Sequence, residues 1–456
     1  MVTNRMKSRK LKSIKSALLA TAFLMVLATV SCSRADHPSL SSVSTPQETV
    51  APTATESRDR SMEVTQENQE TVEPTSIPVL TVESLTRGVG QKTVRIGIIK
   101  TGDVFKDVEV GVEARIRRLE LDQVTGLRKI EIIETIDDGG EKQNALAAAK
   151  TMVEKGAFAV ILASVVADTE VTDYLADQNV PFFGWGFLDG FCYPNQWGFS
   201  FNGCLKGYAL GVSSASLDTG SLRLAEIFYG REPEVILVTT SDDAGAAVEF
   251  LTQQVWGNKL LSVVKIPTGK EIDIAEYVLT EIADLEPDML WLSIGLEQTL
   301  QVKAQLVSSF QGMVVDDVTY LPGILREYEI SKNLEGGYVF TQFPPQEEYR
   351  EATTRLATDL QNIGGPLIYS QAVSLGYWSA DLFMQIVEEV GEELDTRTFF
   401  NVAKVQGIVY DPEVSGGPCP MLTSVVHQNP SGGMALLQVR GGVYHPVVNF
   451  NCPNLD

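Results

Sequence analysis

Residues 181–204 hold the densest set of side chains in this chain that are suited to contact another molecule. The sequence there is PFFGWGFLDGFCYPNQWGFSFNGC, with nine aromatic residues, five glycines and two cysteines in 24 positions. Aromatic faces bind apolar or cationic groups, and glycine lets a backbone approach closely. Trp185, Gly186 and Phe187 follow the apolar run VPFFG and are therefore the first candidates for contact. Phe182 and Phe183 lie inside that run and are expected to be core side chains.

Motifs for catalysis are absent from the sequence. There is no GxSxG or HExxH, TGKE lacks the preceding glycine and the Ser/Thr of a phosphate loop, and GVGQKT lacks the third glycine of a dinucleotide fingerprint. His427 and His445 lie in the C-terminal tail, and no CxxC or Cys/His spacing indicates zinc. We therefore expect no enzyme activity, no cofactor and no metal.

The N-terminus is typical of an export signal. Residues 1–31 contain six basic and no acidic residues, and the apolar run ALLATAFLMVLATV is shorter than a bilayer-spanning helix. The run ends in TVSC, which resembles a bacterial lipobox in its small Ser31 before Cys32. Lipidation of Cys32 and anchoring to the outer face of the cytoplasmic membrane are expected. Plain secretion is the alternative.

The cysteine count agrees with export. The chain has five cysteines, and setting Cys32 aside for lipid leaves four, enough for two disulfides in an oxidising compartment. Three connectivities exist for four cysteines. Pairing of neighbours, Cys192–Cys204 and Cys419–Cys452, is the simplest.

Residues 32–92 are expected to form a disordered tether. They are rich in Ser, Thr, Pro and Glu and poor in large apolar residues, so they cannot bury enough surface to fold. Without residues 1–31 the chain has 30 basic against 59 acidic residues, a net charge of −29. This charge argues against a nucleic-acid partner and favours a monomer.

The remaining chain alternates apolar runs with helical patterns, twice over. TVRIGIIKT, RKIEIIETIDD and AFAVILAS are strand-like in the first series, and EVILVTTSDD, LLSVVKIP and DMLWLSIG in the second. This order predicts an α/β fold with two Rossmann-like lobes, each built on a parallel sheet. Ligands of such sheets lie beyond the carboxyl ends of the strands. The loops there are Thr101–Phe105, Ser164–Thr169, Gly184–Phe187, Ser241–Gly245, Ile294–Glu297 and Tyr320–Gly323.

The series resembles the type I periplasmic binding proteins, in particular the leucine/isoleucine/valine-binding receptors of ABC transporters. The blocks VRIGIIKTGD, IIETIDDGGEKQNALAAAKTMVEKGAFAVILAS, ADQNVPFFGW, EVILVTTSDDAGAAVEFL and IADLEPDMLWLSIG carry the resemblance. It implies two lobes joined by a hinge of three crossings, near Gly203–Leu205, Tyr338–Gln342 and Gly407–Glu413. Lobe 1 would comprise residues 93–205 and 342–408, and lobe 2 residues 206–341 and 409–456.

The resemblance also implies a function. A small-molecule solute enters the cleft, one lobe closes on the other, and the closed form docks on an ABC transporter permease. Val165 and Val166 stand where relatives place Ser/Thr hydroxyls for an amino acid, so an aromatic acid, an amide or a short peptide is preferred over a simple zwitterion. The expected ligand contacts are Phe105, Ser164, Val166, Thr169, Trp185, Gly186, Phe187, Asp243, Glu297 and Tyr320.

Two alternatives stay open. Asp243 and Glu297 are also well placed as helix N-terminal residues, where the helix dipole favours acidic side chains. The same fold serves as a ligand sensor, so a receptor lipoprotein that feeds a separate signalling partner is the second functional reading.

Overall fold

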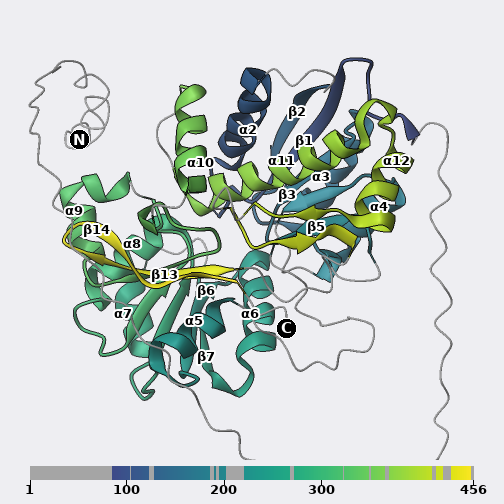
Figure 1. Cartoon of the computed structure of the whole chain (residues 1–456). Helices are drawn as coiled ribbons and strands as arrows, with labels where there is room; N and C mark the ends of the chain where they lie inside the picture. Colours follow the sequence, from purple (N-terminus) through teal and green to yellow (C-terminus); the bar gives the residue numbers. More distant parts are fainter. Residues whose placement is uncertain are drawn as a thin grey trace, which may run out of the picture. The chain divides into compact units, whose positions relative to one another are not determined.

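The computed structural model describes the chain in twelve stretches, all within the compact unit Glu73–Asp456. They are residues 85–102, 104–122, 128–184, 189–191, 195–201, 220–267, 272–321, 323–348, 351–364, 369–412, 417–424 and 433–452. Two sheets, A and B, organise these residues (Figure 1). The predicted fold class, α/β with Rossmann-like lobes, is confirmed.

Sheet A has the strand order β2-β1-β3-β4-β5, and all neighbouring strands are parallel. Its strands are β1 (Thr93–Lys100), β2 (Lys129–Asp137), β3 (Ala159–Ala163), β4 (Phe182–Gly184) and β5 (Gly198–Ser200). Its helices are α2 (Val108–Asp122), α3 (Lys142–Glu154), α4 (Thr169–Asp177), α10 (Glu351–Asn362), α11 (Gln371–Val390) and α12 (Thr396–Phe400), which a π-helix, Asn401–Gly407, continues. The strands are continuous apolar runs because helices cover both faces of a parallel sheet.

Sheet B has the order β14-β13-β10-β9-β8-β6-β7. Its strands are β6 (Val235–Thr240), β7 (Leu260–Ile266), β8 (Met289–Ser293), β9 (Met313–Asp316), β10 (Tyr338–Thr341), β13 (Met434–Arg440) and β14 (Val443–Asn451). Its helices are α5 (Gly220–Tyr229), α6 (Asp243–Trp256), α7 (Ile274–Glu281), α8 (Leu296–Leu306) and α9 (Tyr328–Leu334).

The period of two along these strands sends alternate side chains to two separate cores. Leu290 and Leu292 of β8 join the cluster formed with α7 and α8, whereas Met289 and Trp291 join the cluster that contains Leu224 of α5. Neighbouring residues of a strand point to opposite faces of the sheet. Sheet B is therefore covered on both sides, as the continuous apolar runs require.

The C-terminal tail adds a feature that the sequence patterns did not predict. β13 pairs antiparallel with both β10 and β14, so sheet B is mixed at this edge. Gly441 and Gly442 form the turn of the β13–β14 hairpin with φ values of 59° and 75°. A two-residue turn with positive φ at both positions matches the twist of a hairpin, and glycine adopts it without strain.

Candidate functional site

The loops that follow the strands of both sheets approach each other. Gly140 follows β2 of sheet A, and a Cβ built on it would lie 3.6 Å from the Cβ of Ala244, in the first turn of α6 beside sheet B. Ala244 also packs against the large apolar cluster that contains the core of sheet A. The carboxyl ends of the two sheets thus border a shared region, which is the expected place for a ligand.

On the sheet A side, a buried carboxylate organises this region. Asp138 follows β2 and accepts hydrogen bonds from Thr101 Oγ1 at 2.8 Å and from Ser164 Oγ at 2.6 Å. Ser164 Oγ in turn accepts from the backbone N–H groups of Val166 and Ala167, each at 3.1 Å. Burial raises the pKa of Asp138 above its ordinary value, against the effect of these hydrogen bonds.

This network changes what the β3 loop offers to a ligand. The hydroxyl of Ser164 already has one acceptor and two donors, so it shapes the loop rather than presenting a free polar group. Val165, Val166 and Ala167 of this loop are buried in the core cluster. The described part of this loop is therefore apolar, and contact of Ser164 and Val166 with a ligand stays a prediction.

The other sheet A candidates are dispersed. Phe105 is buried in the turn before α2 and belongs to the core cluster. Thr169 is exposed as the first residue of α4, behind Asp168, whose side chain caps the helix by accepting from the N–H of Glu170. Trp185, Gly186 and Phe187 lie outside the described residues.

On the sheet B side, the two acidic candidates occupy first turns of helices. Asp243 is the exposed first residue of α6, and Asp242 before it is the cap that accepts from the N–H of Gly245. Glu297 is the exposed second residue of α8 and lines a groove of about 610 Å³ together with Ile272 and Asn333. Their roles as ligand contacts stay predictions.

Tyr320 is buried, and its hydroxyl is fully engaged. It donates to Oε2 of Glu347 at 2.7 Å and accepts from the N–H of Gln346 at 2.7 Å. Burial raises the pKa of Glu347, against the hydrogen bond from Tyr320. The ring makes edge contacts with Tyr369 and Tyr444, 6.0 and 5.2 Å between centroids. Any contact of Tyr320 with a ligand would use its ring rather than its hydroxyl.

A carboxyl that the sequence reading missed lies beside it. β9 ends at Asp316, so the loop begins at Asp317, three residues earlier than expected. Asp317 is partly buried, and its carbonyl accepts from Nε2 of Gln371 at 3.3 Å. The side chain of Gln371 also accepts from the backbone N–H of Gln342, through its Oε1. Gln342 itself is buried, and its own Oε1 has no hydrogen-bond partner among the described residues. The acidic pair in VVDD, Asp316 and Asp317, was the signal for this site.

Burial, with a smaller contribution from the Asp316 carboxylate, raises the pKa of Asp317 to about 7. The folded chain therefore holds this proton more tightly than the unfolded chain, and the ionised group opposes folding as pH rises from about 4 to 7. We expect Asp317→Asn to match the parent below pH 4 and to be more stable by about 1–2 kcal/mol at pH 8, less than full burial would give. Urea denaturation across this pH range measures the difference.

Asp243→Asn is the matched control, because Asp243 is exposed and favoured by the α6 dipole. It should show no gain at pH 8. An Asp317→Asn profile parallel to that of the parent would contradict the assignment.

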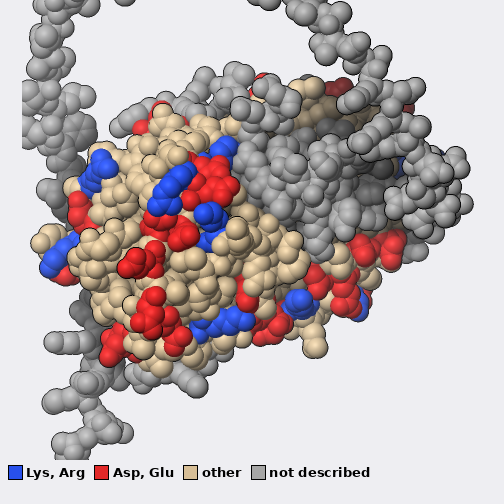
Figure 2. Space-filling model, turned by 90° about the horizontal axis from the view of Figure 1, so that it is seen from below, with Lys and Arg blue, Asp and Glu red and all other residues tan. Residues whose placement is uncertain are grey.

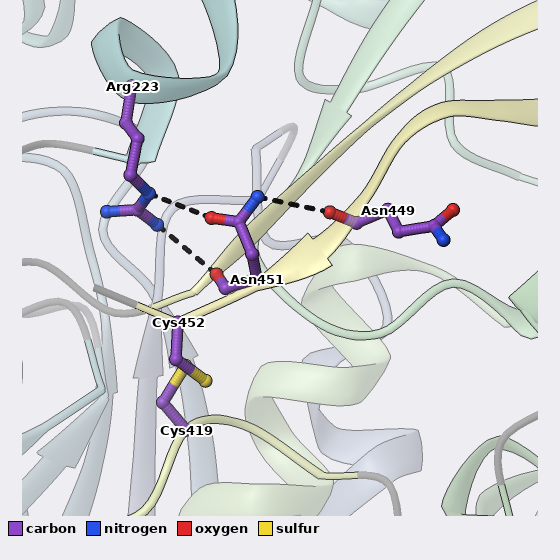
Figure 3. The surroundings of a disulfide bond; sticks show 5 residues. All are labelled: Arg223, Cys419, Asn449, Asn451 and Cys452. Atoms are coloured by element: carbon purple, nitrogen blue, oxygen red, sulfur yellow. Dashed lines mark hydrogen bonds between the residues drawn. A yellow bond between two sulfur atoms is a disulfide. The ribbon is translucent and has the colours of Figure 1, made fainter. Parts of the chain in front are cut away.

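The structure confirms one predicted disulfide. Cys419 and Cys452 are bonded, with 5.6 Å between their Cα atoms (Figure 3). Cys32, Cys192 and Cys204 lie outside the described residues, so their fates stay predictions. Among the residues that the structure describes, no group of His, Cys, Asp and Glu is arranged to hold a metal ion.

On the face that Figure 2 shows, the described residues form no large patch of basic side chains for a polyanion. Figure 2 shows acidic and basic side chains interspersed among uncharged ones on the described part of the face seen from below. No helix within the described stretches is both long and apolar enough to cross a bilayer.

Two α/β lobes whose strand ends approach each other are the architecture of a bilobal binding protein. A sequence model of the periplasmic binding protein family matches residues 93–442. The chain belongs to this family, as the resemblance indicated, and the expectation that it is not an enzyme is confirmed. A search of curated proteins finds no match to this chain.

Solved structures agree on the fold. A branched-chain amino acid ABC transporter protein from Thermus thermophilus with bound valine has a TM-score of 0.64 at 13% identity, over 80% of this chain and 98% of that chain. A fatty acid ABC transporter substrate-binding protein from Thermomonospora curvata has 0.63 at 15%, over 81% and 95%. A solute-binding protein from R. palustris in complex with benzoate has 0.59 at 13%, over 79% and 98%.

Proposed function

We propose that this chain captures a small organic solute with substantial apolar surface between its lobes and delivers it to the permease of an ABC importer. The observation that carries the proposal is the apolar loop Val165–Ala167 at the carboxyl end of sheet A, the edge of that sheet where Gly140 approaches Ala244 beside sheet B. A buried zwitterion needs several free polar partners, and the hydroxyls of Ser164 and Tyr320 are already engaged.

The solute class follows from what is left. The buried amide oxygen of Gln342 has no hydrogen-bond partner among the described residues, and Gln371 joins Gln342 to the backbone of Asp317, whose carboxyl has a raised pKa. Two of the similar solved structures contain valine and benzoate, and the third is named as the substrate-binding protein of a fatty acid transporter. These solutes combine an apolar body with a small polar head, which suits a cleft with apolar walls. An aromatic acid, an amide or an amino-acid-like compound that is not a simple zwitterion is the solute that we propose.

The lobes and the anchor complete the proposal. Lobe 1 is placed at residues 93–205 and 342–408 and lobe 2 at 206–341 and 409–456, with solute contacts that are made only in the closed state driving closure. A lipid on Cys32 and the tether 32–92 would hold the monomer at the outer face of the cytoplasmic membrane. Fractionation of cells that express Cys32→Ser tests the anchor, because this variant has no cysteine to acylate.

The solute is tested by thermal shift on the chain without its signal peptide. Valine, benzoate, benzamide and decanoate are the first probes. A true solute at 100 times its dissociation constant adds about 2.7 kcal/mol to the free energy of unfolding. We expect an aromatic or amide probe to give the largest shift, and Trp185→Ala to abolish most of it.

Phe250→Ala is the control, because Phe250 is an exposed aromatic residue at 43% of its surface on α6. It should keep the shift. A largest shift with valine would contradict the preference against a zwitterion, and an unchanged shift in Trp185→Ala would remove that residue from the site.

A further inference from the structure

Residues 417–424, GPCPMLTS, connect the two sheets by a route other than the main chain, and we call them the strap. Cys419 is bonded to Cys452, which directly follows β14 of sheet B (Figure 3). Arg223 of α5 holds this strand end, since its Nε donates to Oδ1 of Asn451 at 2.8 Å and its Nη2 to the carbonyl of Asn451 at 3.2 Å. Cys419 also packs in the apolar cluster of Ala435 and Phe450. This end of the strap belongs to sheet B.

The other end of the strap contacts sheet A. Its β12 (Met421–Leu422) pairs with β11 (Val409–Tyr410) in a separate two-stranded sheet. Thr423 donates its N–H to the carbonyl of Ile408 at 3.0 Å, and Thr423 Oγ1 accepts from the N–H of Ile408 at 3.0 Å. The buried Lys404 of the π-helix donates to the carbonyls of Thr423 and of Gly198 in β5, both at 3.1 Å.

Lys404 is therefore the group that attaches the strap to the edge strand of sheet A. Its ammonium also lies 4.0 Å from the centre of the Phe199 ring, in the same strand. A cation over an aromatic face and two carbonyl acceptors together favour a defined position for a buried ammonium. The π-turn geometry of residues 401–407 places this side chain toward β5 rather than toward solvent.

The strap is short and stiff. Pro418 and Pro420 flank Cys419, and a proline fixes its own φ and keeps the preceding residue extended. Gly417 lies against α11, because a Cβ built on it would be 2.9 Å from Cζ3 of Trp378. From Cys419 to Thr423 the chain spans at most about 14 Å, whereas the ten-residue connection 424–433 to β13 spans up to about 35 Å. The disulfide is thus the tighter of the two links.

We propose that the strap is a fourth link across the hinge, which limits how far the lobes open and so slows the exchange of solute. This inference rests on the proposed function, because it needs lobes that move. Because the strap is short and held at both ends, opening that moves sheet A away from sheet B strains it, and this strain raises the free energy of the open form only. Its removal therefore favours opening and leaves the closed contacts unchanged.

The test measures the distance between the lobes without any solute. Fluorophores are attached through non-cysteine chemistry at Gln143 in α3 and Ala246 in α6, both exposed near the contact of Gly140 with Ala244. We expect Cys419→Ser/Cys452→Ser to increase the open population in single-molecule energy transfer by about fivefold or more. Lys404→Met, which releases the other end, should change the distribution in the same direction with the disulfide intact.

Val264→Ala is the matched control, because Val264 is buried in the core of sheet B away from the strap. It should lower the melting temperature and leave the distance distribution as in the parent. If the disulfide variant also has a lower melting temperature but an unchanged distance distribution, the strap only stabilises the fold and the inference is wrong. Valine, benzoate and decanoate then separate the two proposals. If a probe still narrows the distribution of distances between the lobes, solute capture is supported without a role for the strap. If the lobes neither open nor respond to any probe, both the proposed function and the strap inference are contradicted.

Discussion

Replacing Lys303 by Met is expected to lower the free energy of unfolding by about 3–5 kcal/mol, because it leaves the carboxylate of Asp316 buried without its cation. Lys303 of α8 and Asp316 at the end of β9 form an ion pair, and the side chains are 1% and 0% exposed. Nζ of Lys303 also donates to the carbonyl of Tyr338 at 2.6 Å. The substitution therefore removes both a charge partner and a hydrogen-bond donor.

The same change is expected to disturb the candidate site. Asp316 accepts from the N–H groups of Val318 and Thr319, at 2.8 and 2.6 Å, and from the hydroxyl of Thr319 at 2.8 Å. These bonds fold the loop that carries Asp317 and Tyr320. A carboxylate that moves once its cation is lost will loosen this loop, so solute binding should weaken along with stability.

Chemical denaturation followed by circular dichroism measures the loss. Lys265→Met is the control, because the Lys265 pair with Glu249 leaves the lysine side chain 48% exposed. An exposed ion pair contributes about 0–1 kcal/mol, so this variant should stay close to the parent. Equal effects of the two substitutions would show that burial of the Lys303–Asp316 pair is unimportant.

Gly376→Ala is expected to cost about 3 kcal/mol, the upper end of the range for overpacking. Gly376 of α11 faces α2, and a Cβ built on it would lie 2.0 Å from the carbonyl oxygen of Val108. Gly111 of α2 is in the same situation on the other side of the contact, because a Cβ built on it would lie 1.9 Å from the carbonyl oxygen of Val373 in α11. Two helices whose backbones touch have no side-chain end that can rotate away, so the helices themselves must separate.

Thermal unfolding of Gly376→Ala against Gly323→Ala measures this effect. Gly323 has no atom within 4 Å of its Cβ position, and its φ of −69° suits alanine. Gly323→Ala should be neutral or stabilising by up to about 1 kcal/mol. A Gly376→Ala variant as stable as the parent would mean that α2 and α11 separate at little cost.

Much of the fold could be read from the sequence, because the patterns involved are local. A strand such as AFAVILAS must be covered on both faces wherever it lies, and its alternation with helical segments leaves few architectures. The disulfide Cys419–Cys452 could also be predicted, because pairing of neighbouring cysteines is the simplest of the three possible connectivities. The β13–β14 hairpin could also have been predicted, because the pair Gly441–Gly442 lies between two runs of alternating apolar and polar residues. It was missed because the tail as a whole is rich in Gly and Pro.

The candidate site could not be predicted in the same way, because tertiary contacts decide which polar groups are free to bind a ligand. Ser164 and Tyr320 have the right residue types at the right strand ends, yet partners 26 and 27 residues away engage their hydroxyls. The acidic pair of VVDD could have marked Asp317 as a candidate, but its raised pKa comes from burial beside Asp316, which the pair does not reveal.

The sequence by itself determined the alternation of strands and helices in both lobes and the family, but not the antiparallel edge of sheet B. The tertiary structure alone decided which polar side chains already have hydrogen-bond partners, and that a disulfide and Lys404 tie one short segment to both sheets. The physical reason is that a hydrogen bond or a disulfide depends on which distant residues the fold brings within a few ångströms. Periodicity records only which face of an element is buried.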